Sequence, residues 1–493
     1  MTDNSTEPTF AKTSPSKSFF VDMLTRDIEL KDALLDLLDN CMDGVVRQRS
    51  SQSDKPITEK PFAGYHAHIS IDKGVFRIED NCGGIPLEVA RERAFAIGRS
   101  SAFKSTEADG ATVGMYGIGM KRAIFKMGRN ATVESRSDEH FLVTIDDDWL
   151  SNEEWEELPI QTNKTDTFQL VENGTRIEVT KLRPEVSSKF DDDTFIDEFR
   201  KEVSRHYALI VEKGFDVLIG RPKEVENGEA ETQVSAEDFL LLDSGDNEDV
   251  VIKPIFYEGT VEGVKFEIFA GLTAPPLDKE QIDEGIADTK SSYKVNKSGW
   301  TVACNDRIVV WRDRTLVTGW GTAGVPAYHN QFSPVAGLVL LYADDPNLLP
   351  LTTTKRGIDL SSKAYQIILD LMRTATKELT SFTNRYKNAD SRGPIFEKAR
   401  LQPLKSLQKE RAAAVEAGQT KTLRKAGVQG TVERLVKYPE MKKTSSKKRI
   451  SYLVEKTEIK EVERFLGMED ADAKDVGRET FDRSLKDARS FDE

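Results

Sequence analysis

The stretch "LLDLLDNCMDG", residues 34–44, decides the fold of this chain. Its apolar spacing predicts a helix, on which Asp36, Asn40 and Asp43 share one face because they are spaced i, i+4 and i+7. The rest of the helix surface is apolar, so the helix is expected to be buried almost all round. Unpartnered carboxylates are costly to bury, and the polar face therefore predicts a solvent-filled pocket or a cation beside the helix. The helix alone leaves open the alternative that this face lies in solvent, where its polar side chains and Asp39 only raise solubility.

The bulk composition indicates a soluble globular protein of several domains. The chain has 493 residues, of which 38% are hydrophobic and 31% are charged. It contains no apolar run of about 18 residues, which predicts no membrane span, and its N-terminus lacks the layout of a secretory signal. The three cysteines fit a reducing cytosol, so we expect a cytoplasmic protein. A net charge of −14 argues against binding nucleic acid through bulk charge, although a local basic patch stays open.

The order of apolar patterns predicts three folded parts after a flexible tail. The first part begins with a helix expected over 19–46 and contains two strands around a turn at 72–74. The second begins with a helix over 193–213 and is then rich in strands, including a hairpin that turns at 305–306. The third is charged and mostly helical. The predicted boundaries are a tail over 1–19, a first α/β domain over 20–185, a second α/β domain over 190–360 and a mostly helical C-terminal region over 361–493.

Three glycine-bearing stretches follow the helix. "FRIEDNCGGIP" (76–86) ends a strand in Asp80, whose carboxylate could accept a hydrogen bond from an exocyclic amine while the glycines let a flat ring approach the backbone. "GATVGMYGIGMKRAIF" (110–125) places glycines before a helix, where their N–H groups suit an anion and Lys121 could reach a phosphate. "GTRIEV" opens a strand with Thr175, whose hydroxyl could pair with a ring nitrogen or with Asp80. Each stretch alone is a weak signal.

Together and in this order, the motifs resemble those of one superfamily. "LLDLLDNCMDG", "EDNCGGI", "VGMYGIGMKRA" and "GTRIEV" are similar to the successive motifs of the GHKL ATPases. That superfamily includes gyrase-type topoisomerases, ninety-kilodalton heat-shock chaperones, MutL-type repair proteins, Microrchidia ATPases and sensor histidine kinases. "IGRSSAFKST" with the glycine motif is most similar to the chaperone and Microrchidia lids. The resemblance implies a two-layer α/β sandwich that binds Mg²⁺ and ATP between a helical layer and a mobile lid, followed by an α/β transducer-like domain.

The resemblance also implies roles for individual residues. Asn40 matches the asparagine that binds the Mg²⁺ bridging the ATP phosphates, and Asp36 stands where hydrolysing members carry a glutamate that activates water. Asp80 matches the aspartate that reads the adenine amine, and Thr175 a threonine near adenine. The predicted ATP-binding residues are Asn40, Asp43, Asp80, Gly84, Ile85, Ser100, Ser101, Gly114, Tyr116, Gly117, Ile118, Gly119, Met120, Lys121 and Thr175.

Two departures from the family pattern bear on the expected chemistry. Asp36 is one methylene shorter than the usual glutamate, and because a general base must lie within hydrogen-bond reach of its water, hydrolysis is expected to be slow. Cys82 occupies the third position of the adenine motif, where glycine is usual, and glycine follows at 83. The approach of adenine to this loop is therefore expected to be adjusted.

The region after the motifs favours an ATP switch over a kinase. A sensor histidine kinase needs a phosphorylatable histidine on a helix, normally before the ATPase motifs. None of the five histidines of this chain lies on such a helix ahead of the motifs. "LPLTTTKRGIDL" (349–360) places a basic pair in a polar loop, which resembles the loop that carries a transducer lysine to the γ-phosphate. We expect Lys355 to fill this catalytic role, with Arg356 as the second candidate. A solvated basic loop is the alternative.

The expected function is a Mg²⁺-dependent ATPase that acts as a slow conformational switch. ATP would order a lid over 98–119, two N-terminal domains would form a homodimer, and Asp36 would activate water. The client is expected to be a protein held by 361–493, or DNA or RNA held by the basic stretch 437–449, for which a solvated linker is the alternative. The alternative function is a regulatory scaffold that binds ATP or ADP with little hydrolysis.

Overall fold

The computed structural model describes most of the chain. The described residues are 16–50, 59–96, 118–152, 155–162, 165–245, 252–277, 282, 297–352, 356–387, 395–422, 427–434, 438–439 and 454–490. The chain divides into two compact units, Met1–Met441 and Lys442–Glu493.

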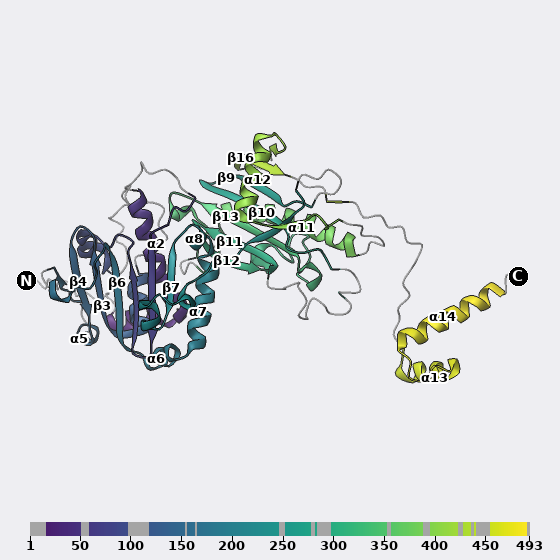
Figure 1. The fold of residues 1–493 in the computed structure, drawn as a ribbon, viewed down its shortest axis with the longest axis horizontal. Coiled ribbons are helices and arrows are strands. Elements are labelled where there is room, and N and C mark those ends of the chain that lie inside the picture. Colours follow the sequence, from purple (N-terminus) through teal and green to yellow (C-terminus); the bar gives the residue numbers. More distant parts are fainter. Residues whose placement is uncertain are drawn as a thin grey trace, which may run out of the picture. The chain divides into compact units, whose positions relative to one another are not determined.

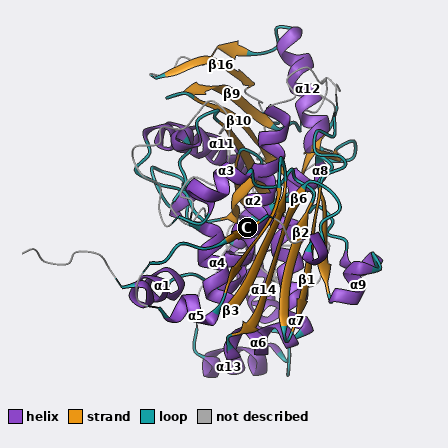
Figure 2. Ribbon diagram, turned by 90° about the vertical axis from the view of Figure 1, so that its left-hand side faces the viewer, coloured by secondary structure: helices purple, strands orange, loops and turns teal. Residues whose placement is uncertain are grey.

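The first part of the larger unit is built on a mixed sheet whose strands run in the order β5-β4-β3-β6-β2-β1-β7 (Figure 1). Neighbours pair antiparallel except β1 and β7, which are parallel. Figure 2 shows β6, β2 and β1 side by side. The strands are β1 (His66–Asp72), β2 (Val75–Asp80), β3 (Gly128–Arg136), β4 (His140–Ile145), β5 (Ile160–Gln161), β6 (Gly174–Leu182) and β7 (Asp216–Gly220).

Helices cover one face of this sheet, because alternate residues of each strand are apolar and need cover. In β2, Phe76, Ile78 and Asp80 are buried on the helix side, whereas Arg77 and Glu79 face the other way. The core joins these strands to α2, α4, α6 and α7. The helices of this part are α1 (Lys17–Arg26), α2 (Leu30–Ser50), α3 (Leu87–Val89), α4 (Gly119–Met127), α5 (Asp147–Ser151), α6 (Pro184–Asp191), α7 (Asp193–His206), α8 (Ala208–Glu212) and α9 (Pro222–Glu226), with a π-helical turn over Ala90–Ala94.

Two helices that the sequence predicts as continuous are each broken. The helix expected over 19–46 is divided into α1 and α2, and α1 packs against α4 and α5. The helix expected over 193–213 is divided into α7 and α8 at Tyr207, whose φ and ψ are −110° and 12°. The sheet also extends to β7, past residue 185, where the first domain was expected to end.

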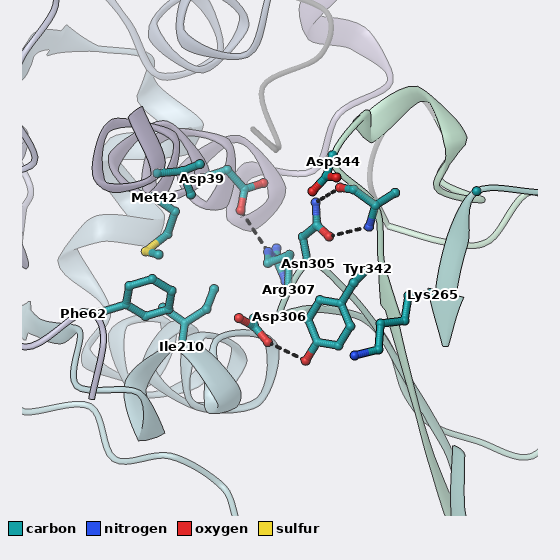
Figure 3. A pocket seen from close by; sticks show the side chains of 13 residues that line it. Asp39, Met42, Phe62, Ile210, Lys265, Asn305, Asp306, Arg307, Tyr342 and Asp344 are labelled. Carbon is teal, nitrogen blue, oxygen red and sulfur yellow. Dashed lines mark hydrogen bonds and ion pairs between the residues drawn. The ribbon is translucent and has the colours of Figure 1, made fainter. Parts of the chain in front are cut away.

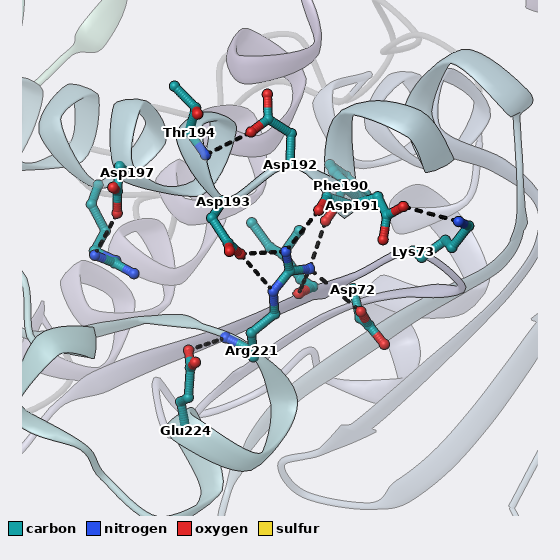
Figure 4. A network of polar contacts seen from close by, with 12 residues as sticks. Asp72, Lys73, Phe190, Asp191, Asp192, Asp193, Thr194, Asp197, Arg221 and Glu224 are labelled. Carbon is teal, nitrogen blue, oxygen red and sulfur yellow. Dashed lines mark hydrogen bonds and ion pairs between the residues drawn. The ribbon is translucent and has the colours of Figure 1, made fainter.

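Arg221 joins the end of β1 to the helices that follow β6 (Figure 4). Its guanidinium donates to the backbone oxygens of Phe190 (2.7 Å) and Asp191 (3.1 Å) and pairs with the carboxylates of Asp193 (2.5 Å) and Asp72 (3.4 Å). A planar fork of N–H donors suits such a convergence of acceptors. The contact fixes α6 and α7 against the sheet edge formed by β1 and β7.

The second part of the larger unit is a sheet with the strand order β12-β11-β13-β10-β9-β16-β15. Helix α11 covers one face, and α8 and α12 cover the other. The predicted turn at 305–306 is confirmed, and a second turn joins β9 to β10 at 262–263. All four turn residues have positive φ. The elements are β8 (Leu240–Asp243), β9 (Ile255–Val261), β10 (Val264–Leu272), β11 (Gly299–Cys304), β12 (Arg307–Asp313), β13 (Val335–Tyr342), α11 (Lys363–Lys387), β14 (Arg400–Pro403, paired with β8), α12 (Leu404–Glu416), β15 (Lys421–Thr422) and β16 (Val428–Arg434).

The C-terminal unit consists of α13 (Lys456–Leu466) and α14 (Ala473–Ser490), which pack against each other. The described residues after 361 are mostly helical, as predicted, but they also contribute β14, β15 and β16. No helix in the described part of the chain combines the length and the apolar character that crossing a membrane needs.

Candidate functional site

The polar face of α2 is buried. Asp36, Asp39 and Asp43 are 6%, 2% and 5% exposed, while Asn40 is half-buried. The alternative that these side chains lie in solvent and only raise solubility is therefore wrong. Buried carboxylates need partners, and the structure shows where several of them come from.

Asp36 is paired with an arginine from α4. The Nη2 atom of Arg122 donates to Asp36 Oδ2, and the first residue of α4, Gly119, packs so closely that a Cβ added there would lie 3.4 Å from Asp36 Cβ. The start of α4, which carries the end of the glycine motif, therefore lies directly against the predicted general base. Sequence reasoning missed Arg122, although it follows Lys121 in the quoted motif.

Asn40 is the predicted metal ligand, and its surroundings suit that role. Among the residues that the structure describes, none makes a hydrogen bond with its side-chain amide, and the residue keeps access to solvent. Within the same residues no group of three or more His, Cys, Asp or Glu forms a metal site. One amide oxygen fits Mg²⁺ that is otherwise held by phosphates and water, because this ion usually takes few protein ligands.

Asp80 is held at the end of β2 by groups from two motifs. Its carboxylate accepts hydrogen bonds from the backbone N–H of Cys82 (2.7 Å) and from the thiol of Cys41 on α2 (3.4 Å). Burial raises the pKa of the Asp80 carboxyl, and these hydrogen bonds lower it in part. Thr175 is the direct cross-strand neighbour of Asp80. Pairing of its hydroxyl with Asp80 or with a ring nitrogen stays a prediction.

The loop after Asp80 is packed tightly against β3 and β6. Gly84 has a φ of +69°, and a Cβ there would lie 2.2 Å from the backbone oxygen of Arg136. The N–H of Ile85 donates to the Ser135 hydroxyl (2.7 Å), which lies 3.4 Å from the Thr175 hydroxyl. These contacts bring Gly84, Ile85 and Thr175 together at one end of the sheet.

Helix α2 approaches this loop through a glycine that sequence reasoning did not single out. A Cβ added to Gly44 would lie 2.5 Å from the backbone oxygen of Cys82. Only glycine lets the helix come so close to the loop. The signal was present in the sequence, because Gly44 ends the opening motif.

Lys121 is buried, and its ammonium is engaged. The Nζ atom donates to the backbone oxygens of Ala94 (2.9 Å) and Ala96, and burial lowers the Lys121 pKa to about 8. A contact with phosphate stays a prediction. Ile118 and Met120 flank Gly119 at the start of α4. The predicted site residues Ser100, Ser101, Gly114, Tyr116, Gly117 and Lys355 lie outside the described residues, as does nearly all of 437–449.

Helix α2 also contacts the second sheet, through Asp39 (Figure 3). Arg307 Nε donates to Asp39 Oδ1 (2.9 Å), and the Tyr207 hydroxyl donates to the same oxygen. The Arg307 guanidinium lies 4.4 Å from the centroid of the Tyr207 ring and donates to the backbone oxygen of Ile308 (2.8 Å). A cavity of about 410 Å³ adjoins this contact and is lined by α2 and the second sheet. Sequence reasoning found no role for Asp39 or Arg307.

A second ion pair joins the same two parts nearer the start of α2. Arg356 Nη2 lies 2.5 Å from Asp32 Oδ1, and Arg356 Nη1 lies 4.0 Å from Glu202 on α7. Burial and the nearby Arg307 lower the pKa of Arg356. The loop that carries the predicted basic pair thus reaches the helix that carries Asp36 and Asn40.

Comparison with known proteins agrees with the motifs. Residues 28–176 match the family model described as histidine kinase-, DNA gyrase B- and HSP90-like ATPase. No curated protein matches the chain. The matched segment contains α2, the loop after Asp80, α4 and the start of β6, which are the elements that the site is built from. The α/β fold agrees with this assignment, and residues 28–176 therefore belong to the GHKL superfamily of ATPases.

Proposed function

We propose that the chain is a Mg²⁺-dependent ATP switch that hydrolyses ATP slowly and passes its nucleotide state to the second domain. One observation carries this proposal. Helix α2 bears Asp36 and Asn40, its Asp36 pairs with Arg122 at the start of α4, and its Asp39 pairs with Arg307 of the second sheet. The residues expected to touch nucleotide and the contact with the second domain thus belong to one rigid element.

The arrangement supports distinct roles along the site. Asp80, with Thr175 beside it, would accept a hydrogen bond from the adenine amine. Asn40 would hold Mg²⁺, which when bound supplies positive charge against the phosphates. Asp36 would accept the proton of the attacking water, as a general base.

The pairing of Asp36 with Arg122 supports slow turnover. A carboxylate engaged by a guanidinium is a weaker proton acceptor, and it must turn away before it can contact water. The same observation favours a second candidate function, a regulatory scaffold that binds ATP or ADP with little hydrolysis. In either case we propose a homodimer in the ATP-bound state, a cytoplasmic location and a protein or nucleic-acid client.

The test uses the full chain with Mg²⁺ and compares the unmutated protein with Asn40→Ala and Asp36→Asn. Calorimetric titration with ADP and a non-hydrolysable ATP analogue measures binding, a phosphate-release assay measures turnover, and light scattering measures mass. Asn40→Ala should lose Mg²⁺-dependent binding. Asp36→Asn should keep binding and lose turnover by about a hundredfold or more.

The control is Asn227→Ala, on the exposed end of α9 and remote from the motifs. It should behave as the unmutated chain. Binding without measurable turnover in the unmutated chain would favour the scaffold, and a mass that does not change with the ATP analogue would remove the dimer. Binding that is equal in Asn40→Ala and the unmutated chain would overturn the metal assignment.

A further inference from the structure

The second domain holds α2 by two ion pairs on the same side of the helix. Asp32 pairs with Arg356 and Asp39 pairs with Arg307. The two aspartates are seven residues apart, which is close to two helical turns and about 10 Å along the axis. Asp36, the predicted base, lies between them, one turn from Asp32.

The two pairs differ in depth. The side chains of Arg307 and Asp39 are each 2% exposed, and further hydrogen bonds from Tyr207 and to the backbone oxygen of Ile308 satisfy the pair. The side chains of Arg356 and Asp32 are 18% and 32% exposed. A pair near solvent is weak, whereas breaking a deeply buried pair leaves an uncompensated charge.

Arg356 is also incompletely satisfied. Its Nη2 atom is buried, and no atom of the described residues accepts a well-directed hydrogen bond from it, although Asp32 is close. Its other acidic neighbour, Glu202, is 4.0 Å away and lies 3.5 Å from His206 Nε2. A guanidinium whose Nη2 atom is buried without a well-directed acceptor, and whose nearest carboxylate is 32% exposed, is suited to exchange that contact for a stronger anion.

We propose that Asp32 and Arg356 form a latch that the terminal phosphate of ATP opens, while Asp39 and Arg307 form a pivot that stays closed. Asp32 is then an inhibitory counter-ion, since it competes with phosphate for the Arg356 guanidinium. Guanidinium groups bind phosphate oxygens through two parallel hydrogen bonds, which a single shallow carboxylate contact does not match. This inference rests on the proposed function, because it requires ATP in the first domain.

The latch has a consequence that a merely structural role for Asp32 does not have. ADP lacks the terminal phosphate, so the competition applies to ATP alone. A ligand shifts an equilibrium only through its different affinities for the two states. Loss of Asp32 should therefore strengthen binding of ATP and leave ADP unchanged. If Asp32 only stabilised the start of α2, its loss would affect both nucleotides alike.

The test measures the dissociation constants of a non-hydrolysable ATP analogue and of ADP, with Mg²⁺, for the full chain and three variants. Asp32→Asn should bind the analogue about three- to tenfold more tightly and ADP as before. Arg356→Gln should bind the analogue more weakly than the unmutated chain. The double variant should match Arg356→Gln, because Asp32 has no target without the guanidinium.

The matched control is Glu198→Gln, which removes one negative charge from the exposed pair with Lys31 beside Asp32. It should change neither constant. A gain in Asp32→Asn that is equal for both nucleotides, or that persists in the double variant, would overturn the latch. No change in Asp32→Asn, with nucleotide binding by the unmutated chain intact, would also overturn the latch alone. Absence of binding by the unmutated chain would instead overturn the proposed function.

Discussion

Arg307 of β12 and Asp39 of α2 form an ion pair of 2.9 Å that joins helix α2 to the second sheet, and both side chains are 2% exposed. Tyr207, from the junction of α7 and α8, is fully buried and donates to the same carboxylate oxygen. Two segments far from α2 in sequence thus supply the partners of the buried Asp39 carboxylate. Asp39 immediately precedes Asn40, so the contact with the second sheet and the predicted metal ligand lie on the same turn of α2.

Breaking this pair should be costly. Arg307→Met leaves Asp39 buried without its counter-ion, and Asp39→Asn leaves Arg307 buried without its counter-ion. Each variant should therefore lower the free energy of unfolding by about 3–5 kcal/mol. The double variant removes both charges and should lose less than the sum of the two single variants. Urea denaturation, followed by tryptophan fluorescence, measures the free energy of unfolding of each variant. Additive losses would show that the two residues act independently.

Gly44→Ala tests the close approach of α2 to the adenine loop. The new Cβ would lie 2.5 Å from the backbone oxygen of Cys82, so helix and loop must separate. Because this loop carries Asp80, we expect affinity for nucleotide to fall about tenfold or more, with stability lowered by about 1–3 kcal/mol. Gly74→Ala is the control, since nothing lies within 4 Å of a Cβ there. Equal affinities in the two variants would contradict this role for Gly44.

Asp243 should make stability depend on pH. Burial, together with the neighbouring Glu410 carboxyl, raises the Asp243 pKa from 3.8 to about 7. Between these values the folded chain keeps a proton that the unfolded chain releases, so this group's contribution to stability is present at low pH and is lost as pH rises from about 4 to 7. Asp243→Asn should abolish that loss. Relative to the unmutated chain, the free energy of unfolding of the variant should be higher by about 1–3 kcal/mol more at pH 8 than at pH 4.

Thermal or urea unfolding of Asp243→Asn at several pH values checks this prediction. Asp238→Asn, at an exposed position before β8, is the control. Parallel pH profiles for the unmutated chain and Asp243→Asn would show that Asp243 titrates in the same range in both states.

Arg221→Ala should destabilise the first domain without touching the site. The change removes the hydrogen bonds to the backbone oxygens of Phe190 and Asp191 and the ion pair with Asp193. The Arg221 side chain is 22% exposed, so water can replace part of these contacts, and we expect a loss of about 1–3 kcal/mol. Lys73→Ala removes a pair whose side chains are 66% and 53% exposed and should have almost no effect. A similar loss in both variants would contradict this reading of Figure 4.

Local sequence patterns predicted many elements of the fold correctly. The polar helix, the two strands around the turn at 72–74 and the hairpin at 305–306 are confirmed, because periodicity and turn residues act within a few positions of each other. The break at Tyr207 was missed, since that residue leaves helical geometry where its hydroxyl reaches Asp39 and the backbone oxygen of Leu35. Local propensity contains no information about such a distant partner.

The sequence by itself determined that residues 34–44 form a helix with its acids on one face, that Asp80 ends a strand beside glycines, and that the ordered motifs resemble those of the GHKL superfamily. Only the tertiary structure decided which cation each acid meets, namely Arg122 for Asp36, Arg307 for Asp39 and Arg356 for Asp32. The first two pairs span 86 and 268 residues of sequence. The strength of an ion pair depends on distance and burial, and both quantities arise only when distant segments pack together.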